Sequence, residues 1–100
     1  MCVKRLRFEW DARKAAANLR KHGVSFEEAR TVFLDENALL RSDEDHSEEE
    51  DRFLLLGLSG RLRTVVVCHC YRQDDEVIRL IPARKANSDE RRQYDDRRMR

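Results

Sequence analysis

The sequence predicts a small α+β domain with a mostly antiparallel sheet and with helices packed on one face. Two observations carry this prediction: helix-period segments fill most of residues 11–34, whereas strand-period segments fill most of residues 38–86. A last helical segment follows, so the expected order of elements is β-α-α-β-β-β-β-α. The 100 residues, 40% hydrophobic and 41% charged, suit one domain over residues 1–100 with a single core.

The first strand is expected at residues 6–10, where Leu6, Phe8 and Trp10 alternate with charged residues. Asp11 follows and is placed to cap the N-terminus of a helix. That helix is expected to pack through one narrow apolar stripe, formed by Ala12, Ala15, Ala16 and Leu19.

A tight corner between two helices is the most detailed local prediction. Gly23 supplies the left-handed conformation that ends the first helix, after two cationic residues that suit its C-terminus. Ser25 is a good N-cap for the next helix, and Glu28 stands at the position that closes a capping box. The second helix is expected to run to about Leu34.

The second half of the chain reads as strands followed by one helix. Alternating or apolar runs predict strands at residues 38–42, 53–59, 64–71 and 77–86. An acidic loop separates the first two of these, over residues 43–51. Asn87 and Glu90 form a second capping pair, so a last helix is expected from about Ser88 to about Arg97.

The net charge of +1 hides a segregation of charge along the chain. Residues 1–34 carry a net charge of +4, residues 35–52 of −7, residues 53–83 of +1 and residues 84–100 of +3. This leaves room for an anion-binding face on a nearly neutral protein; the alternative is an ordinary solvated surface. Without a signal peptide or an apolar spanning run, and with three cysteines, we expect a cytoplasmic protein with reduced thiols and no membrane contact.

A metal site is not expected. In Cys68-His69-Cys70 the thiols share one face of a strand while the imidazole points to the other, and no CxxC or HxxxH elsewhere supplies further ligands. The acidic loop lacks EF-hand spacing. Serine hydrolase, Walker and dinucleotide motifs are also absent from the sequence, so no cofactor is expected.

Arginines on strands are the remaining candidates for chemistry, because guanidinium groups bind phosphate bidentately. They are Arg52, Arg72, Arg79 and Arg84, and Lys21 at the helix corner adds a further cation. The alternative is that each arginine pairs with a nearby carboxylate. His46, in the acidic loop, is a candidate acid or base because its ordinary pKa lies near neutrality.

At this point the chain resembles a known family, the BrnT toxins of bacterial type II toxin-antitoxin systems. The resemblance rests on the order and spacing of several segments, which are Phe8-Glu-Trp-Asp11, Asn18-Leu-x-Lys21-His-Gly-Val-Ser25-Phe-Glu-Glu-Ala29, Asp45-His46-Ser47 with Arg52, the turn from Gly57 to Arg61, Ala83-Arg84-Lys-Ala86, and Glu90-Arg91-x-x-Tyr94. The sequence departs from the family at Pro82, where Ser is frequent.

The resemblance implies a RelE-like fold, a ribonuclease that arrests translation, and a cognate BrnA-like antitoxin with a ribbon-helix-helix DNA-binding module. DNA would then be contacted only through the antitoxin. We therefore expect a metal-independent endoribonuclease; the alternative is a non-catalytic domain that binds its antitoxin and tunes transcription.

The residues expected to act on RNA fall into four groups. Arg52, Arg79 and Arg84 are expected to stabilise the phosphate. Lys21 and His46 are candidates for positioning or proton transfer, and Tyr94 for stacking on a base or donating a proton. Further RNA contacts are expected from Arg72, Lys85 and Arg91. Regular alternation would put Arg79 and Arg84 on opposite faces of a strand, unless a bulge at Pro82 changes the register.

Overall fold

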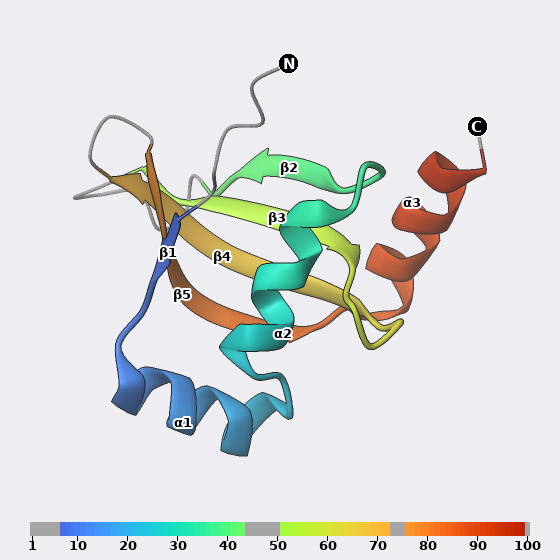
Figure 1. The fold of residues 1–100 in the computed structure, drawn as a ribbon. Helices are drawn as coiled ribbons and strands as arrows, with labels where there is room; N and C mark the ends of the chain where they lie inside the picture. The colour runs from blue at the N-terminus through green and yellow to red at the C-terminus, as the bar shows by residue number, and fades with distance from the viewer. Residues whose placement is uncertain (1–6, 44–50, 73–75, 100) are drawn as a thin grey trace.

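The computed structural model describes residues 7–43, 51–72 and 76–99 (Figure 1). The helical elements are α1 (Ala12–His22), α2 (Phe26–Thr31), the 3-10 turn η1 (Val32–Leu34) and α3 (Ser88–Arg98). The strands are β1 (Arg7–Glu9), β2 (Leu39–Ser42), β3 (Phe53–Leu58), β4 (Thr64–Arg72) and β5 (Val77–Lys85). The predicted α+β class and order of elements are confirmed. No helix in these ranges is long and apolar enough to cross a membrane.

The described strands form one five-stranded sheet in the order β1-β5-β4-β3-β2. β1 pairs with β5 in parallel, and every other neighbouring pair is antiparallel. The expectation of a mostly antiparallel sheet is therefore confirmed. β4 lies at the centre, and its six residues from Val65 to Cys70 are all buried.

The two faces of the sheet carry different hydrophobic clusters, because neighbouring residues of β4 point to opposite sides. Val65 and Val67 belong to the main core, which α2 and η1 cover with Phe26, Ala29 and Val32.

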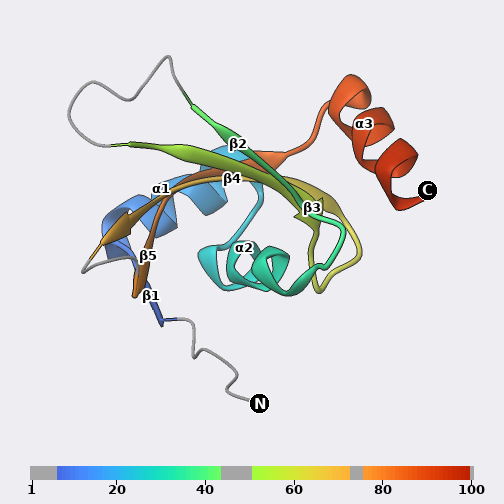
Figure 2. The same ribbon diagram turned by 90° about the horizontal axis from the view of Figure 1, so that it is seen from above.

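On the opposite face, Val66 and Leu56 pack with Tyr94 of α3 in a second cluster. Figure 2 shows α2 on one side of the sheet and α3 on the other. The expectation that the helices pack on one face is therefore wrong for α3. Its sequence carries few apolar residues, and its packing depends mainly on the single buried ring of Tyr94.

α1 begins as predicted, since the Asp11 carboxylate accepts hydrogen bonds from the backbone N–H groups of Arg13 and Lys14. The predicted apolar stripe is wrong, because Ala15 packs against the core while Leu19 is 51% exposed. Ala12 and Ala16 are exposed as well.

The residue that α1 buries instead is Asn18, whose side chain binds the edge of β5. Its Oδ1 accepts from the N–H of Ala83 (3.0 Å), and its Nδ2 donates to the carbonyls of Ala83 (2.9 Å) and Val24 (2.8 Å). In the described part of the chain, β1 pairs with β5 at Val77–Arg79, and Asn18 supplies hydrogen bonds to the edge of β5 further along. This contact fixes the rotation of α1 against the sheet.

The corner after α1 has the predicted geometry at its two caps. Gly23 has a φ of 70° and donates its N–H to the carbonyl of Leu19, and the Ser25 hydroxyl accepts from the N–H of Glu28. The predicted capping box does not form, because the Glu28 carboxylate binds the Ser59 hydroxyl and the Arg63 guanidinium instead. Burial raises the pKa of Glu28, but these hydrogen bonds outweigh it and hold that pKa below its usual value.

Candidate active site

A β-bulge in β5 decides which side chains meet on the open face of the sheet. Val67 pairs with Ala83 and His69 pairs with Leu80, so Cys68 of β4 stands opposite two residues, Ile81 and Pro82. Because of this extra residue, Arg79 pairs with Cys70 and Arg84 pairs with Val66. Two residues that are four apart on β4 share a face, so both arginines lie on the face away from α2. Arg79 and Arg84 could share a face only if the strand had a bulge at Pro82, and this bulge is present.

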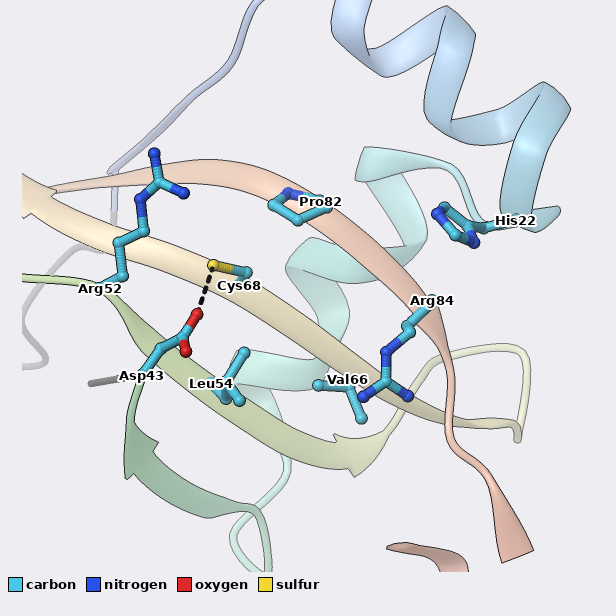
Figure 3. Close-up of a pocket in the computed structure, with 8 residues that line it drawn as sticks. All are labelled: His22, Asp43, Arg52, Leu54, Val66, Cys68, Pro82 and Arg84. Atoms are coloured by element: carbon cyan, nitrogen blue, oxygen red, sulfur yellow. Dashed lines mark hydrogen bonds between the residues drawn. The ribbon is translucent and has the colours of Figure 1, made fainter. Parts of the chain in front are cut away.

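A cleft of about 450 Å³ lies on this face, and we call it the arginine cleft (Figure 3). It is lined by His22, Asp43, Arg52, Leu54, Val66, Cys68, Pro82 and Arg84. Leu54, Val66 and Cys68 form its floor on β3 and β4, and the polar residues come from α1 and from strand ends. The cleft thus brings together side chains that lie up to 62 positions apart, from His22 to Arg84.

Arg84 and His22 lie toward one end of the cleft (Figure 3). Arg84 forms a bidentate ion pair with Glu90 of α3, with distances of 2.7 Å and 2.9 Å. This hydrogen bonding raises the pKa of Arg84, so the guanidinium stays charged and is held in one orientation. His22 is the last residue of α1 and is half-buried there.

Arg52 and Asp43 lie at the other end. The backbone N–H of Asp43 donates to the carbonyl of Arg52 (2.8 Å), which fixes the two residues side by side at the ends of β2 and β3. The Cys68 thiol lies 3.9 Å from the Asp43 carboxylate. Burial and this carboxylate raise the pKa of Cys68 to about 11, so at neutral pH the sulfur is a protonated donor and a poor nucleophile. The cleft therefore offers two cations, one imidazole and one carboxylate around an apolar floor.

Comparison with known proteins identifies the family of the chain. A family model described as "Ribonuclease toxin, BrnT, of type II toxin-antitoxin system" matches residues 10–90. The chain belongs to the BrnT family. The family consists of ribonuclease toxins of type II toxin-antitoxin systems, so this BrnT-family chain is a ribonuclease toxin with an antitoxin as its partner. The family description supports the enzymatic interpretation and not the alternative of a non-catalytic domain.

A solved structure supports the fold. The ribonuclease toxin BrnT of Brucella abortus matches with a TM-score of 0.63 and 21% sequence identity, over 84% of this chain and 100% of that one. No curated protein sequence matched.

Two of the predicted RNA-binding arginines of this BrnT-family chain lie outside the cleft lining. Arg79 and Arg72 both form ion pairs with Glu9, at 3.3 Å and 3.4 Å. Together with the Arg84–Glu90 pair, these contacts match the alternative expectation that the arginines pair with nearby carboxylates. Arg84 differs from the other two because it also faces the cleft.

The structure gives Tyr94 a packing role that does not fit stacking on a base. Its side chain is 1% exposed, and its hydroxyl donates to the Asp35 carboxylate at 2.5 Å. Burial and this carboxylate raise the pKa of Tyr94 to about 12. Arg91 donates to the carbonyl of Ala86, and Lys85 is exposed at the end of β5. None of these three residues lines the arginine cleft.

Lys21 lines a groove that adjoins the cleft, and His46 lies outside the described residues. Two residues of the cleft, His22 and Asp43, were not predicted as site residues. His22 is one of the two cationic residues that were predicted to suit the C-terminus of the first helix, but its place four residues after Asn18 also puts both on one side of α1. Asp43 is the first residue after a predicted strand, and nothing in its local sequence distinguishes it from the acidic residues that follow.

Proposed function

We propose that this toxin cleaves single-stranded RNA in the arginine cleft, with the scissile phosphate bound between Arg52 and Arg84. The observation that carries the proposal is the β5 bulge, which turns Arg84 to the same face as Arg52 and leaves a cleft between them. Two guanidinium groups that line one cavity suit a phosphate that gains negative charge in the transition state.

The proposed reaction is an internal transesterification. The ribose 2′-oxygen attacks the adjacent phosphorus, the bond from phosphorus to the 5′-oxygen breaks, and the products are a 2′,3′-cyclic phosphate and a 5′-hydroxyl. His22 takes the proton of the 2′-hydroxyl and returns it to the leaving 5′-oxygen. Arg52 and Arg84 stabilise the phosphorane, since arginine stays protonated and does not act as the base.

Substitution of the cleft residues tests the proposal. Arg52→Gln, Arg84→Gln and His22→Gln should each lower the single-turnover cleavage rate by about 100-fold or more. Arg92→Gln on the exposed surface of α3 is the matched control and should cleave like the parent. Thermal unfolding of each variant separates loss of chemistry from loss of fold. Parent-like cleavage by both folded arginine variants would refute the cleft as the active site.

We also propose that the reaction needs no metal, because the transesterification can be catalysed by protein side chains alone. Cleavage should survive excess EDTA unchanged. If EDTA abolishes cleavage and a divalent ion restores it, the acidic segment at residues 43–51 becomes the first candidate for the ion site and the mechanism above is wrong.

The antitoxin partner is proposed to be a BrnA-like ribbon-helix-helix protein that covers the arginine cleft, so that the toxin contacts DNA only through it. The two cleft arginines suit an acidic antitoxin segment as well as RNA. A complex with the antitoxin should therefore lose binding of a non-cleavable 2′-O-methyl RNA. A stable ternary complex of toxin, antitoxin and this RNA would place the antitoxin elsewhere.

A further inference from the structure

We propose that the groove between α1 and β5 is a second RNA subsite, which binds the nucleotides next to the cleaved phosphodiester. This inference rests on the proposed function and extends it beyond the arginine cleft. The groove has a volume of about 290 Å³, close to the lower limit for ligand pockets. We call it the α1 groove; its lining residues are Lys14, Ala17, Asn18, Lys21, His22, Ile81 and Pro82.

The groove continues the arginine cleft. His22 and Pro82 line both cavities, so they form the boundary that the two share. An RNA strand whose scissile phosphate lies between Arg52 and Arg84 can pass His22 and Pro82 and continue along α1. The β5 bulge helps to build this path, because it presents the extra residue at Ile81–Pro82 beside the helix.

The charge of the groove suits a polyanion. Lys14 and Lys21 are seven residues apart, so they lie on one side of α1 at a spacing of about 10 Å along its axis. Among the residues that the structure describes, no carboxylate lines the groove. The closest acidic neighbour in sequence is Asp11, whose pKa is lowered mainly by hydrogen bonds from the backbone N–H groups of Lys14 and Arg13 and to a smaller extent by the charge of Lys14.

The two lysines also differ from the arginines of the sheet. Arg72, Arg79 and Arg84 each pair with a carboxylate, whereas neither Lys14 nor Lys21 forms an ion pair within the part of the chain that the structure describes. Their ammonium groups can therefore bind phosphates without first giving up a protein partner. An ammonium group on a flexible stem also adapts to the phosphates of a single strand.

Three of the residues that line the groove are apolar. Ala17, Ile81 and Pro82 provide a surface on which the face of a ribose or a base can pack. Pro82 has no N–H group, so covering it leaves no backbone donor without a partner. Two lysines that can bind phosphates, beside an apolar surface that can pack against a ribose or a base, suit a nucleotide better than a free anion.

Binding of non-cleavable 2′-O-methyl RNA of two lengths tests the subsite. The variant is Lys14→Ala with Lys21→Ala, and the matched control is Arg13→Ala with Arg20→Ala, which removes two charges from the same helix outside the groove. For a hexanucleotide, the lysine variant should bind at least tenfold more weakly, and the slope of log K against log salt should fall by about 1.4 for two lost phosphate contacts. The control should change binding by less than twofold.

A dinucleotide fills only the arginine cleft, so the parent and the lysine variant should bind it equally. The inference is overturned if the lysine variant binds the hexanucleotide like the arginine control, or if the dinucleotide and the hexanucleotide lose affinity equally. A parent protein that binds neither RNA would also overturn it. If the expected binding pattern holds but the parent cleaves no RNA, the subsite stands and the proposed catalytic mechanism fails.

Discussion

His69 shows how strongly one buried side chain can link stability to pH. Its ring is fully buried and lies in edge contact with Phe33 and Tyr71, with centroid distances of 4.8 Å and 5.2 Å. Its nitrogens face the carbonyl of Val67 and the hydroxyl of Tyr71, both at 3.3 Å. Burial lowers the pKa of His69 to about 4, against an ordinary value of 6.5, because the charged form has lost its hydration.

The sign of the pH dependence follows from this depressed pKa. Below pH 6.5 the unfolded chain binds a proton at His69 that the folded chain does not accept until about pH 4. As the pH is lowered through this window, the free energy of unfolding should therefore fall by about 1.4 kcal/mol per pH unit, or about 3 kcal/mol in all.

Urea unfolding at pH 7 and at pH 4.5 measures this effect, and His69→Gln should show a smaller loss than the parent. His22→Gln, which removes a histidine that is only half-buried, is the matched control and should lose stability like the parent. An equal loss in the parent and in His69→Gln would assign the acid sensitivity to carboxylates instead.

At the scale of elements, the Glu90 carboxylate joins α3 to one of the cations of the cleft. Glu90 accepts from the N–H of Asn87 in the capping box (2.9 Å) and also binds the Arg84 guanidinium. The hydrogen bonds from Arg84 are the main reason that the pKa of Glu90 lies below its usual value. The same residue thus starts a helix and orients a cleft residue.

Substitutions at Glu90 should separate these two roles. Glu90→Ala should lower the free energy of unfolding by about 1–2 kcal/mol, whereas Glu90→Gln should cost less because an amide oxygen can still accept from Asn87. Both should bind 2′-O-methyl RNA more tightly than the parent, because a negative charge beside the cleft is removed. Urea unfolding and RNA titration give the two readouts; unchanged RNA affinity in both variants would mean that RNA does not approach Arg84.

Asn18 allows a second test at this scale. Asn18→Ala leaves the N–H of Ala83 and two carbonyl oxygens without their partner, which should cost about 2–4 kcal/mol of unfolding free energy. Asn37→Ala, at an exposed position, is the matched control and should change stability by less than about 0.5 kcal/mol. A mild effect of Asn18→Ala would show that water replaces the amide at the edge of β5.

Local signals explain why most elements could be predicted from the sequence. The cap at Asp11, the left-handed Gly23 and the capping box at Asn87 depend on residues within a few positions, and all three have the predicted form. The apolar stripe of α1 was misplaced because the burial of Asn18 depends on Ala83, 65 positions away. Glu28 does not form the predicted capping box for a similar reason, because its partner Arg63 lies 35 positions away.

At the scale of the whole molecule, the sheet has two faces with different tasks. One face packs against α2 and carries the main core, and the other carries the arginine cleft. α3 lies on the side of the sheet away from α2 (Figure 2). The spacing of five residues between Arg79 and Arg84 could show that they need a bulge to share a face of the strand. It could not show that Arg79 would pair with Glu9, because that contact depends on the parallel pairing of β1 with β5.

The bulge also makes one segment of β5 tolerant of a change in length. Residues 81 and 82 together stand opposite one residue of β4. If one of them is deleted, the side chains of β5 alternate regularly between the two faces of the sheet, and the residues on either side of the deletion keep the faces that they have now. Deletion of Ile81 should therefore keep cooperative unfolding, with a midpoint within several degrees of the parent.

Deletion of Val66 gives the contrast, because β4 has no spare residue at that point and one half of the strand must turn its core side chains outward. Circular dichroism during heating distinguishes the two outcomes, and equal damage from both deletions would contradict the argument. A chain that is one residue shorter between Leu80 and Ala83 would then still present both arginines to the same side. In this strand, the count of residues between two pairing points matters more than the identity of the residue that fills the gap.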